Sequence, residues 1–224
     1  MTGTLTISGW GQPHDALAHL APTAKHIDFA RHQSAHAALL DIAAHNPTPD
    51  LVIGWSLGGQ LAVRAIAAGI LKPKKLVLIA APFQFVKRPE LPIGMPRDLF
   101  DKFRDNYARN PLQTLTKAWE LIHKDDTNEQ IVRAHLEKHD KQALLTKDWL
   151  RWLDLLEEFS CENLYLADFP PTILIHGDGD LVVYPEQSVY FAKAIPHAKH
   201  IILPGCGHAP HWHAAQLVKQ VIHE

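Results

Sequence analysis

The sequence predicts an α/β fold, with a mostly parallel sheet of about six strands that is flanked by helices and interrupted by a helical insertion. Two observations predict it. Short apolar runs alternate with helical stretches up to residue 85 and again after residue 168, which is typical of parallel strands joined by crossover helices. Residues 86–168 contain helical stretches but no convincing strand. We therefore expect a core made of residues 1–85 and 169–224 and a helical lid at residues 86–168, which we call the lid segment.

Apolar runs and helix stop signals define the elements in order. The first half of the core is expected to contain strands at 5–8, 24–30, 51–53 and 75–80, and helices at 15–20, 33–45 and 57–68. The lid segment has helical stretches at 97–108, 111–123, 128–139 and 146–158. The core then resumes with strands at 172–176 and 200–203 and helices at 185–195 and 211–222.

The turn after the third expected strand carries the strongest functional signal. Gly54-Trp55-Ser56-Leu57-Gly58 matches G-x-S-x-G, the nucleophile elbow, with a strand before it and a helix after it. Ser56 would stand above the first amides of that helix, which have no intrahelical partner and favour a developing negative charge. The alternative is an incidental serine in a glycine-rich turn. The strand and helix around the motif favour the nucleophile.

A serine hydroxyl needs a base to take its proton and a carboxylate to orient that base. Ser56 is followed by Asp178 or Asp180 and then by His208, each in a loop after an expected strand and in the order typical of this motif. Asp180 is preferred because Gly179 and the apolar residues after it place Asp180 at the outer turn, whereas Asp178 would cap that turn. The alternative for His208 is a solvated loop histidine, because the chain has 16 histidines.

Other groupings of reactive side chains do not predict a site. His208, His211 and His213 suggest metal ligands, but the last two are two residues apart near a helix start and cannot share a helical face. His176 with Asp178 and Asp180 is a second possible set of metal ligands, and it is equally weak. Cys206 lacks an elbow and is interpreted as a packed small residue. No Walker loop or dinucleotide fingerprint is present, so we predict neither a metal nor a cofactor.

Composition excludes some broad classes of partner. A formal net charge of -2 gives no reason to expect nucleic acid or an anionic membrane, and no apolar run reaches the roughly 20 residues of a membrane span. The N-terminus lacks the pattern of a signal peptide. Two cysteines, Cys161 and Cys206, form no disulfide framework. We expect a cytoplasmic monomer.

These motifs together resemble the α/β-hydrolase superfamily over essentially the whole chain, and most closely its pimeloyl-acyl-carrier-protein methyl ester esterases of biotin synthesis. The residues that carry the resemblance are Gly9-Trp10-Gly11, Gly54 to Gly59, Gly177 with Asp180, Leu181 and Val182, and Gly207-His208-Ala209-Pro210. The chain departs from the pattern in two ways: it begins at what would be the family's third strand, and Ser8 stands where members usually have histidine.

The resemblance implies a carboxylesterase with Ser56 as nucleophile, Asp180 as acid and His208 as base, and with the amides of Trp10 and Leu57 as an oxyanion hole. It also implies an acyl-carrier protein as partner, docked on basic residues of the lid segment. Residues 87–124 contain eight basic and five acidic residues, whereas 125–168 contain five and eleven. The first candidates for docking are Arg88, Arg97, Arg104 and Arg109, and ordinary solvated helix faces are the alternative.

Two other functions remain open. Within the hydrolases, the chain is also compatible with a general short-chain carboxylesterase acting on small esters, or with a thioesterase. From another class, it is compatible with a weakly catalytic hydrolase-fold receptor that binds a small ligand. A complete set of nucleophile, base and acid favours the enzyme.

Overall fold

The computed structural model describes residues 3–146 and 148–224. Its six strands form one sheet in the order β2-β1-β3-β4-β5-β6, and every neighbouring pair is parallel. This confirms the predicted parallel sheet of about six strands. The strands are β1 (Thr4–Ile7), β2 (Lys25–Ile27), β3 (Leu51–Trp55), β4 (Leu76–Ile79), β5 (Thr172–Gly177) and β6 (Lys199–Leu203).

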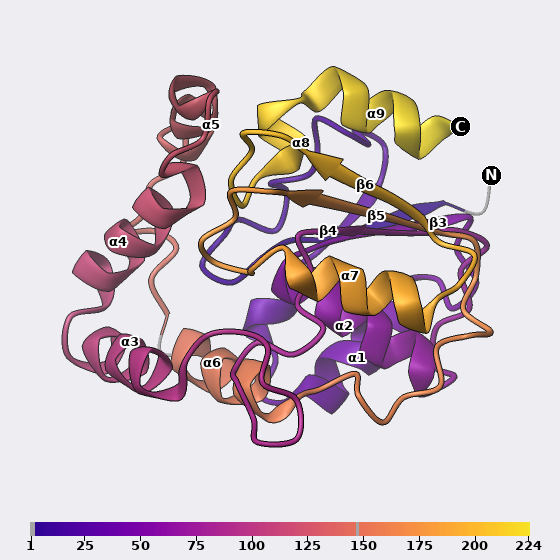
Figure 1. Ribbon diagram of the computed structural model, residues 1–224, viewed down its shortest axis with the longest axis horizontal. Helices are drawn as coiled ribbons and strands as arrows, with labels where there is room; N and C mark the ends of the chain where they lie inside the picture. Colours follow the sequence, from indigo (N-terminus) through magenta and orange to yellow (C-terminus); the bar gives the residue numbers. More distant parts are fainter. Residues whose placement is uncertain (1–2, 147) are drawn as a thin grey trace.

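Helices cover both faces of the sheet, as Figure 1 shows. One face carries α1 (Ala35–His45), α2 (Leu57–Ala67) and α7 (Glu186–Ala194), and the other carries α8 (Pro210–His213) and α9 (Ala215–His223). All residues of β3 and β4 are buried, which explains why these central strands are continuous apolar runs rather than alternating ones.

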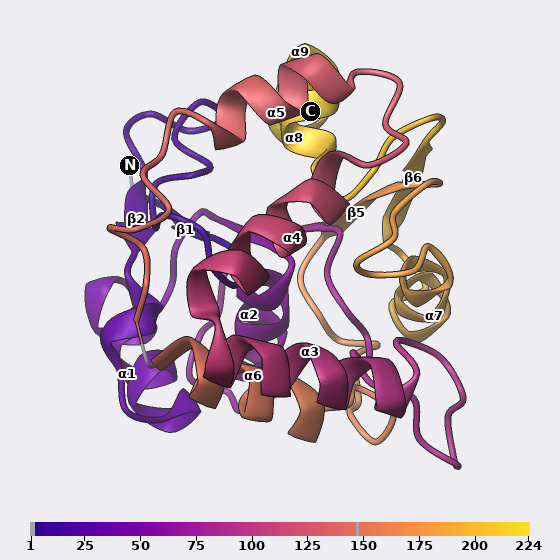
Figure 2. The same cartoon turned by 90° about the vertical axis from the view of Figure 1, so that its left-hand side faces the viewer.

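The lid segment contributes four helices between β4 and β5: α3 (Arg97–Arg109), α4 (Pro111–His123), α5 (Glu129–Leu136) and α6 (Asp148–Glu158). They lie on the side of the molecule toward which the arrows of β5 and β6 point (Figure 1). Figure 2 looks at this side and shows α4 crossing in front of the core, with α3 and α6 below it. The lid segment therefore lies where the loops after the parallel strands meet.

Three expected elements differ from the structure. Residues 15–20 form turns such as Ala18 N to Asp15 O, not a helix. The strand expected at 24–30 is only β2, followed by the 3-10 helix η1 (Phe29–Arg31). The closing helix breaks at Ala214, whose φ of -134° and ψ of 53° are not helical. The break lies beside His213, whose carbonyl accepts a hydrogen bond from the Asn128 side chain at 2.9 Å.

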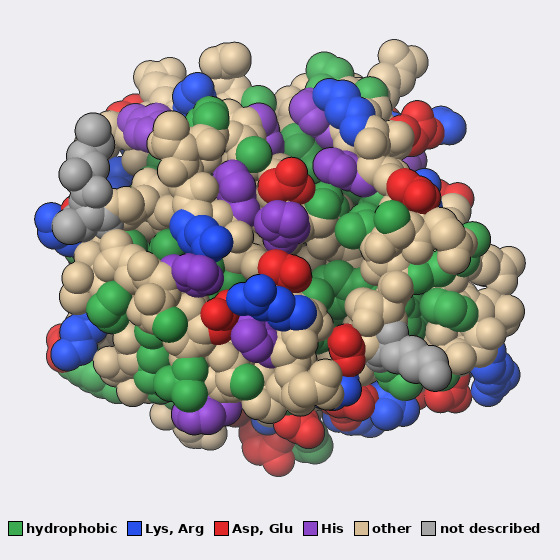
Figure 3. Space-filling model, turned by 180° about the vertical axis from the view of Figure 1, so that it is seen from behind, with side chains coloured by type: hydrophobic (Ala, Val, Ile, Leu, Met, Phe, Trp, Pro, Cys, Tyr) green, Lys and Arg blue, Asp and Glu red, His purple; other side chains and the backbone are tan. Residues whose placement is uncertain are grey.

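None of the helices within residues 3–146 and 148–224 has the length and apolar character that a bilayer crossing requires. On the face seen in Figure 3, basic, acidic and histidine side chains are interspersed.

Candidate active site

Ser56 occupies a strained turn between β3 and α2. Its φ of 54° and ψ of -124° are rare for a residue with a side chain, and such strain costs about 1–3 kcal/mol. The turn is possible because its neighbours are small: a Cβ at Gly58 would lie 2.1 Å from the Ile7 carbonyl oxygen, and one at Gly54 would lie 2.5 Å from the Gly59 Cα. The backbone therefore presents Ser56 at the N-terminus of α2.

Asp180 and His208 come together in the loops after β5 and β6. The carboxylate oxygen Oδ2 of Asp180 accepts a hydrogen bond from His208 Nδ1 at 2.7 Å, and His176 Nε2 lies 3.1 Å from the same oxygen. The amides of Val182 and Val183 donate to Oδ1 at 2.8 and 2.9 Å. Burial alone would raise the pKa of Asp180, but its contacts with His208 and His176 hold that pKa well below its usual value.

The two acidic candidates have different contacts. The Asp178 side chain accepts a hydrogen bond from the Gly205 amide at 2.7 Å and so stabilises the loop that follows β6. Asp180 is the residue that contacts His208, and its exposed fraction is 1%. The structure thus brings Asp180 into contact with His208, and its role as the acid stays a prediction.

Ser56 and His208 line the same cavity beneath the lid segment. The loop after β1 contributes Gly9 and Trp10 to its wall. The remaining wall is almost entirely apolar, and none of the described residues that line it is Asp, Glu, Lys or Arg. Its apolar side chains include Phe85, Met95, Phe103, Trp119, Leu153 and Leu156. The cavity is therefore suited to an uncharged chain.

The two amides expected to form an oxyanion hole belong to Trp10, in the loop after β1, and to Leu57, the first residue of α2. Among the described residues, neither the Trp10 nor the Leu57 amide donates a hydrogen bond to a backbone carbonyl. The Trp10 indole donates to the Trp149 carbonyl at 2.8 Å, and its ring lies 5.4 Å from that of Phe103 and 5.1 Å from that of Tyr107. The lid segment thus anchors the loop that carries the Trp10 amide.

Comparison with known proteins agrees with this architecture. A family model described as "Alpha/beta hydrolase family" matches residues 4–220. The chain belongs to the alpha/beta hydrolase family.

Two bacterial relatives of this hydrolase carry the same description, pimeloyl-[acyl-carrier protein] methyl ester esterase. The one from Nitrosomonas europaea is 29% identical over 82% of this chain and 77% of the relative. The one from Xanthomonas oryzae pv. oryzae is 30% identical over 94% of this chain and 84% of the relative.

Solved structures show the same fold at lower identity. A bromoperoxidase from Bacillus anthracis superimposes with a TM-score of 0.83 at 18% identity, covering 99% of this chain and 91% of that one. An esterase from Exiguobacterium antarcticum superimposes with a TM-score of 0.78 at 14% identity, covering 98% and 89%. At these identities the likeness concerns the hydrolase fold alone.

The lid segment of this hydrolase is hydrogen-bonded to the loop that carries His208. Between α4 and α5, the buried Asp126 accepts from the Gly207 amide at 2.8 Å, from the Asn128 amide at 2.7 Å and from His213 Nδ1 at 2.7 Å. The His208 amide also donates to the carbonyl of Ile122 at 3.1 Å. Sequence reasoning missed Asp126, because no motif links it to residues more than 80 positions away.

One cluster of side chains in the hydrolase has the spacing of a metal site, but its carboxylate already accepts hydrogen bonds. Asp126, Cys206 and His213 each have one ligand atom within 4.8 Å of the others. However, three N–H groups already donate to the Asp126 carboxylate. Burial raises the pKa of the Cys206 thiol far above its usual value, which disfavours the thiolate that a metal needs. This chemistry does not favour a metal here.

Three of the four arginines proposed for docking bond to α6 instead of facing solvent freely. Arg88 donates to the carbonyls of the last two residues of α6. Arg97 pairs with Glu157, and Arg104 pairs with Asp154. These contacts join α3 and the chain before it to α6.

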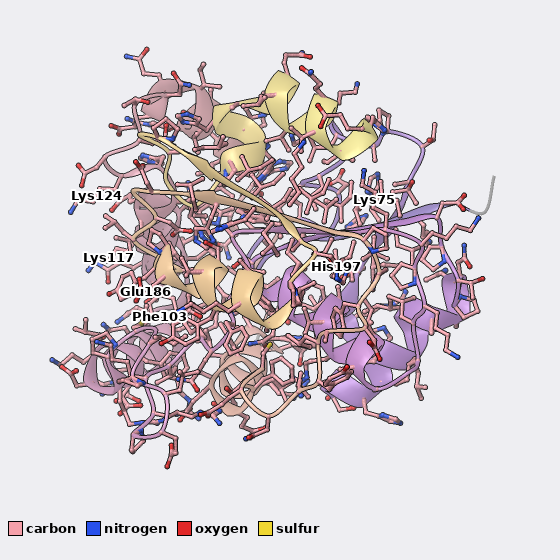
Figure 4. The ribbon with its side chains drawn as sticks, turned by 45° about the vertical axis from the view of Figure 1, so that its right-hand side comes forward. Lys75, Phe103, Lys117, Lys124, Glu186 and His197 are labelled. Carbon is pink, nitrogen blue, oxygen red and sulfur yellow. The ribbon has the colours of Figure 1, made fainter. Side chains whose placement is uncertain are left out.

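Among the described residues, the fourth arginine pairs only with a neighbour on its own helix. Arg109 lies 3.6 Å from Asp105, one turn earlier on α3, and 71% of its side chain is exposed. Lys117 on α4 and Lys124 directly after it are exposed and project away from the sheet (Figure 4). The cations available to a partner therefore lie on the outer side of α3 and α4.

Proposed function

We propose that this protein hydrolyses the methyl ester of pimeloyl-acyl-carrier protein, a step of biotin synthesis, through a Ser-His-Asp triad and an acyl-enzyme. The observation that supports it best is the pairing of Asp180 with His208 beside Ser56 at an uncharged cavity. Relatives that cover most of the chain at 29–30% identity carry this activity in their names.

This chain is a carboxylic ester hydrolase of the alpha/beta hydrolase family. The two cysteines are free and buried, which is compatible with the reducing cytoplasm in which we place the enzyme.

In the proposed mechanism, His208 Nε2 takes the proton of Ser56 as the hydroxyl oxygen attacks the ester carbonyl. Asp180 holds Nδ1 and stabilises the imidazolium that forms. The amides of Trp10 and Leu57 stabilise the oxyanion of the tetrahedral intermediate. His208 then protonates the departing methoxide, so that methanol leaves and the acyl group stays on Ser56. A water molecule that gives its proton to the same imidazole then hydrolyses this acyl-enzyme and releases the acid.

The charge pattern supports a substrate carried by an acidic protein. A methyl pimeloyl chain is neutral along its length, and the cavity that would hold it has no formal charge. We propose that Arg109 of α3, Lys117 of α4 and Lys124 directly after α4 bind the carrier, because other contacts already occupy Arg88, Arg97 and Arg104. The latter three support the docking surface by holding α3 against α6.

The test is growth of a biotin-requiring bacterial strain that lacks its pimeloyl-carrier esterase, with the wild-type gene and the Ser56→Ala variant in parallel. We expect growth with the wild type alone, and a loss of at least about 10³-fold in purified ester hydrolysis for Ser56→Ala. Wild-type protein that cleaves p-nitrophenyl butyrate but does not restore growth would instead indicate a general short-chain esterase. Full hydrolysis by Ser56→Ala would refute the nucleophile.

A further inference from the structure

Gln12 lies in the loop after β1 and lines the same cavity as Ser56 and His208. Its exposed fraction is 4%, so the side chain is removed from bulk solvent. The three tryptophans of the cavity wall use their indole N–H groups elsewhere: Trp10 donates to Trp149 O, Trp55 to His208 O and Trp119 to Gly11 O. Among the described lining residues, Gln12 thus has a side-chain amide that is free to bind a ligand.

Neither polar atom of that amide is satisfied within the described part of the chain. Gln12 Nε2 and Oε1 are both buried and both lack a hydrogen-bond partner there. Burying an amide without a partner is unfavourable, and native proteins rarely retain such groups without a reason. A ligand in the cavity would supply the missing partner.

The side chain also lies close to the reacting group. A methyl group added at Gly9 would be 3.3 Å from Ser56 Cβ and 3.6 Å from Gln12 Cγ, so the two side chains flank one point of the backbone. An ester bound for attack by Ser56 would therefore lie within reach of the Gln12 amide. Apart from Ser56 and His208 of the proposed triad, Gln12 has the one polar side chain among the described lining residues that is not already hydrogen-bonded.

We propose that Gln12 binds the substrate directly, with Nε2 donating a hydrogen bond to the ester group held at Ser56. The contact fixes the position of the ester in a cavity that otherwise recognises only apolar shape. This inference deepens the proposed esterase function and rests on it. It makes Gln12 a substrate-binding residue of this chain in addition to the triad.

The test compares Gln12→Leu with Gln60→Leu. Gln60 is the matched control, because its amide is also fully buried and lacks a partner among the described residues, but it does not line the cavity. With p-nitrophenyl butyrate we expect Gln12→Leu to lower kcat/KM about tenfold, the loss of one hydrogen bond to substrate, and Gln60→Leu to leave it within twofold. The melting temperature of Gln12→Leu should be unchanged or higher, since an unpartnered amide is removed.

Opposite behaviour would overturn the inference. A kcat/KM for Gln12→Leu within twofold of wild type, or an equal loss in Gln60→Leu, would show that the amide does not contact the ester. A loss that follows a lower melting temperature would indicate a structural role, and Gln12→Met provides a second apolar variant of similar length if the leucine does not fold. Wild-type protein without ester hydrolysis would refute the proposed function and this inference together, whereas active wild type with unaffected Gln12 variants would refute the inference alone.

Discussion

Asp180 and Asp126 have almost the same surroundings but lie in different regions, one in the core and one in the lid segment. Each is buried, accepts a hydrogen bond from a histidine Nδ1 at 2.7 Å and accepts two further bonds from backbone amides. His208, the partner of Asp180, lines the cavity beside Ser56, whereas His213, the partner of Asp126, does not. An aspartate–histidine pair therefore does not by itself define a catalytic site. What distinguishes the two pairs is whether the other ring nitrogen of the histidine, Nε2, can reach Ser56.

Between His208 and His213 in the sequence, His211 has no carboxylate partner among the described residues. His211 is fully buried, its ring lies 4.4 Å from that of Trp55, and neither ring nitrogen has a hydrogen-bond partner among the described residues. Within six residues of the chain, the loop after β6 and helix α8 thus contain the histidine that we propose as the base, one that attaches the lid segment and one packed as an aromatic residue.

The largest effect should come from Asp180→Asn, which keeps the shape of the side chain but no longer fixes the ring proton of His208. We expect kcat/KM to fall about 10³–10⁴-fold. The matched control is Asp178→Asn, two residues away, which can still accept from the Gly205 amide. We expect it to remain within about threefold of wild type. A larger loss in Asp178→Asn than in Asp180→Asn would exchange the roles of the two residues.

A smaller effect on activity, but a clear one on stability, is expected from Asp126→Asn. The amide that replaces one carboxylate oxygen cannot accept from all three donors of Asp126, so we expect the free energy of unfolding to fall by about 1–3 kcal/mol. Because one of those donors is the Gly207 amide, next to His208, kcat/KM should fall about tenfold. The two values come from denaturant titration and ester assays.

The control for that experiment is Asp125→Asn, which removes the same charge from the exposed neighbouring position. It should leave both values close to those of wild type. If Asp126→Asn lost as much activity as Asp180→Asn, the proposal that only the pair of Asp180 and His208 takes part in catalysis would be refuted.

The smallest effect concerns the pH dependence of stability in His211→Phe. Burial, with smaller contributions from the charges of His19, His208 and His135, lowers the pKa of His211 well below its ordinary value. The unfolded chain therefore takes up a proton first as the pH falls below about 6.5, and stability that is complete above that pH is lost toward the lower folded pKa. His211→Phe should lose less stability between pH 7 and 5, by up to about 1.4 kcal/mol per pH unit.

Thermal unfolding at several pH values measures this difference. His36→Phe, at an exposed position of α1, is the control and should retain the pH dependence of the wild type. Parallel curves for His211→Phe and wild type would mean that the pKa of His211 is the same in the folded and unfolded protein.

Local sequence signals were enough to predict the sheet and the turn that presents Ser56. Buried parallel strands have continuous apolar sequences, which can be recognised locally. The glycines around Ser56 are required because a Cβ at these positions would lie only about 2 Å from neighbouring backbone atoms. The order of Ser56, Asp180 and His208 placed each after a strand, and these loops meet at one edge of a parallel sheet.

Long-range partners were not predictable in the same way. The helix expected at 211–222 breaks at Ala214 beside His213, which bonds to the distant Asp126 and Asn128. The docking arginines were chosen from local charge, but α6 supplies partners for three of them from residues 50 to 70 positions away. Periodicity and composition carry no information about such pairings. Gln12 was missed because a single glutamine after a glycine-rich turn is not a motif.

The lack of charged side chains in the described cavity wall has a consequence for the release of the product. Hydrolysis turns a neutral ester into an acid that ionises at neutral pH, and a carboxylate buried without a cationic partner is strongly disfavoured. The wall beside Ser56 has no lysine or arginine to hold that carboxylate among its described residues. The acid should therefore bind more weakly than the ester from which it came, so we expect little inhibition by accumulated product.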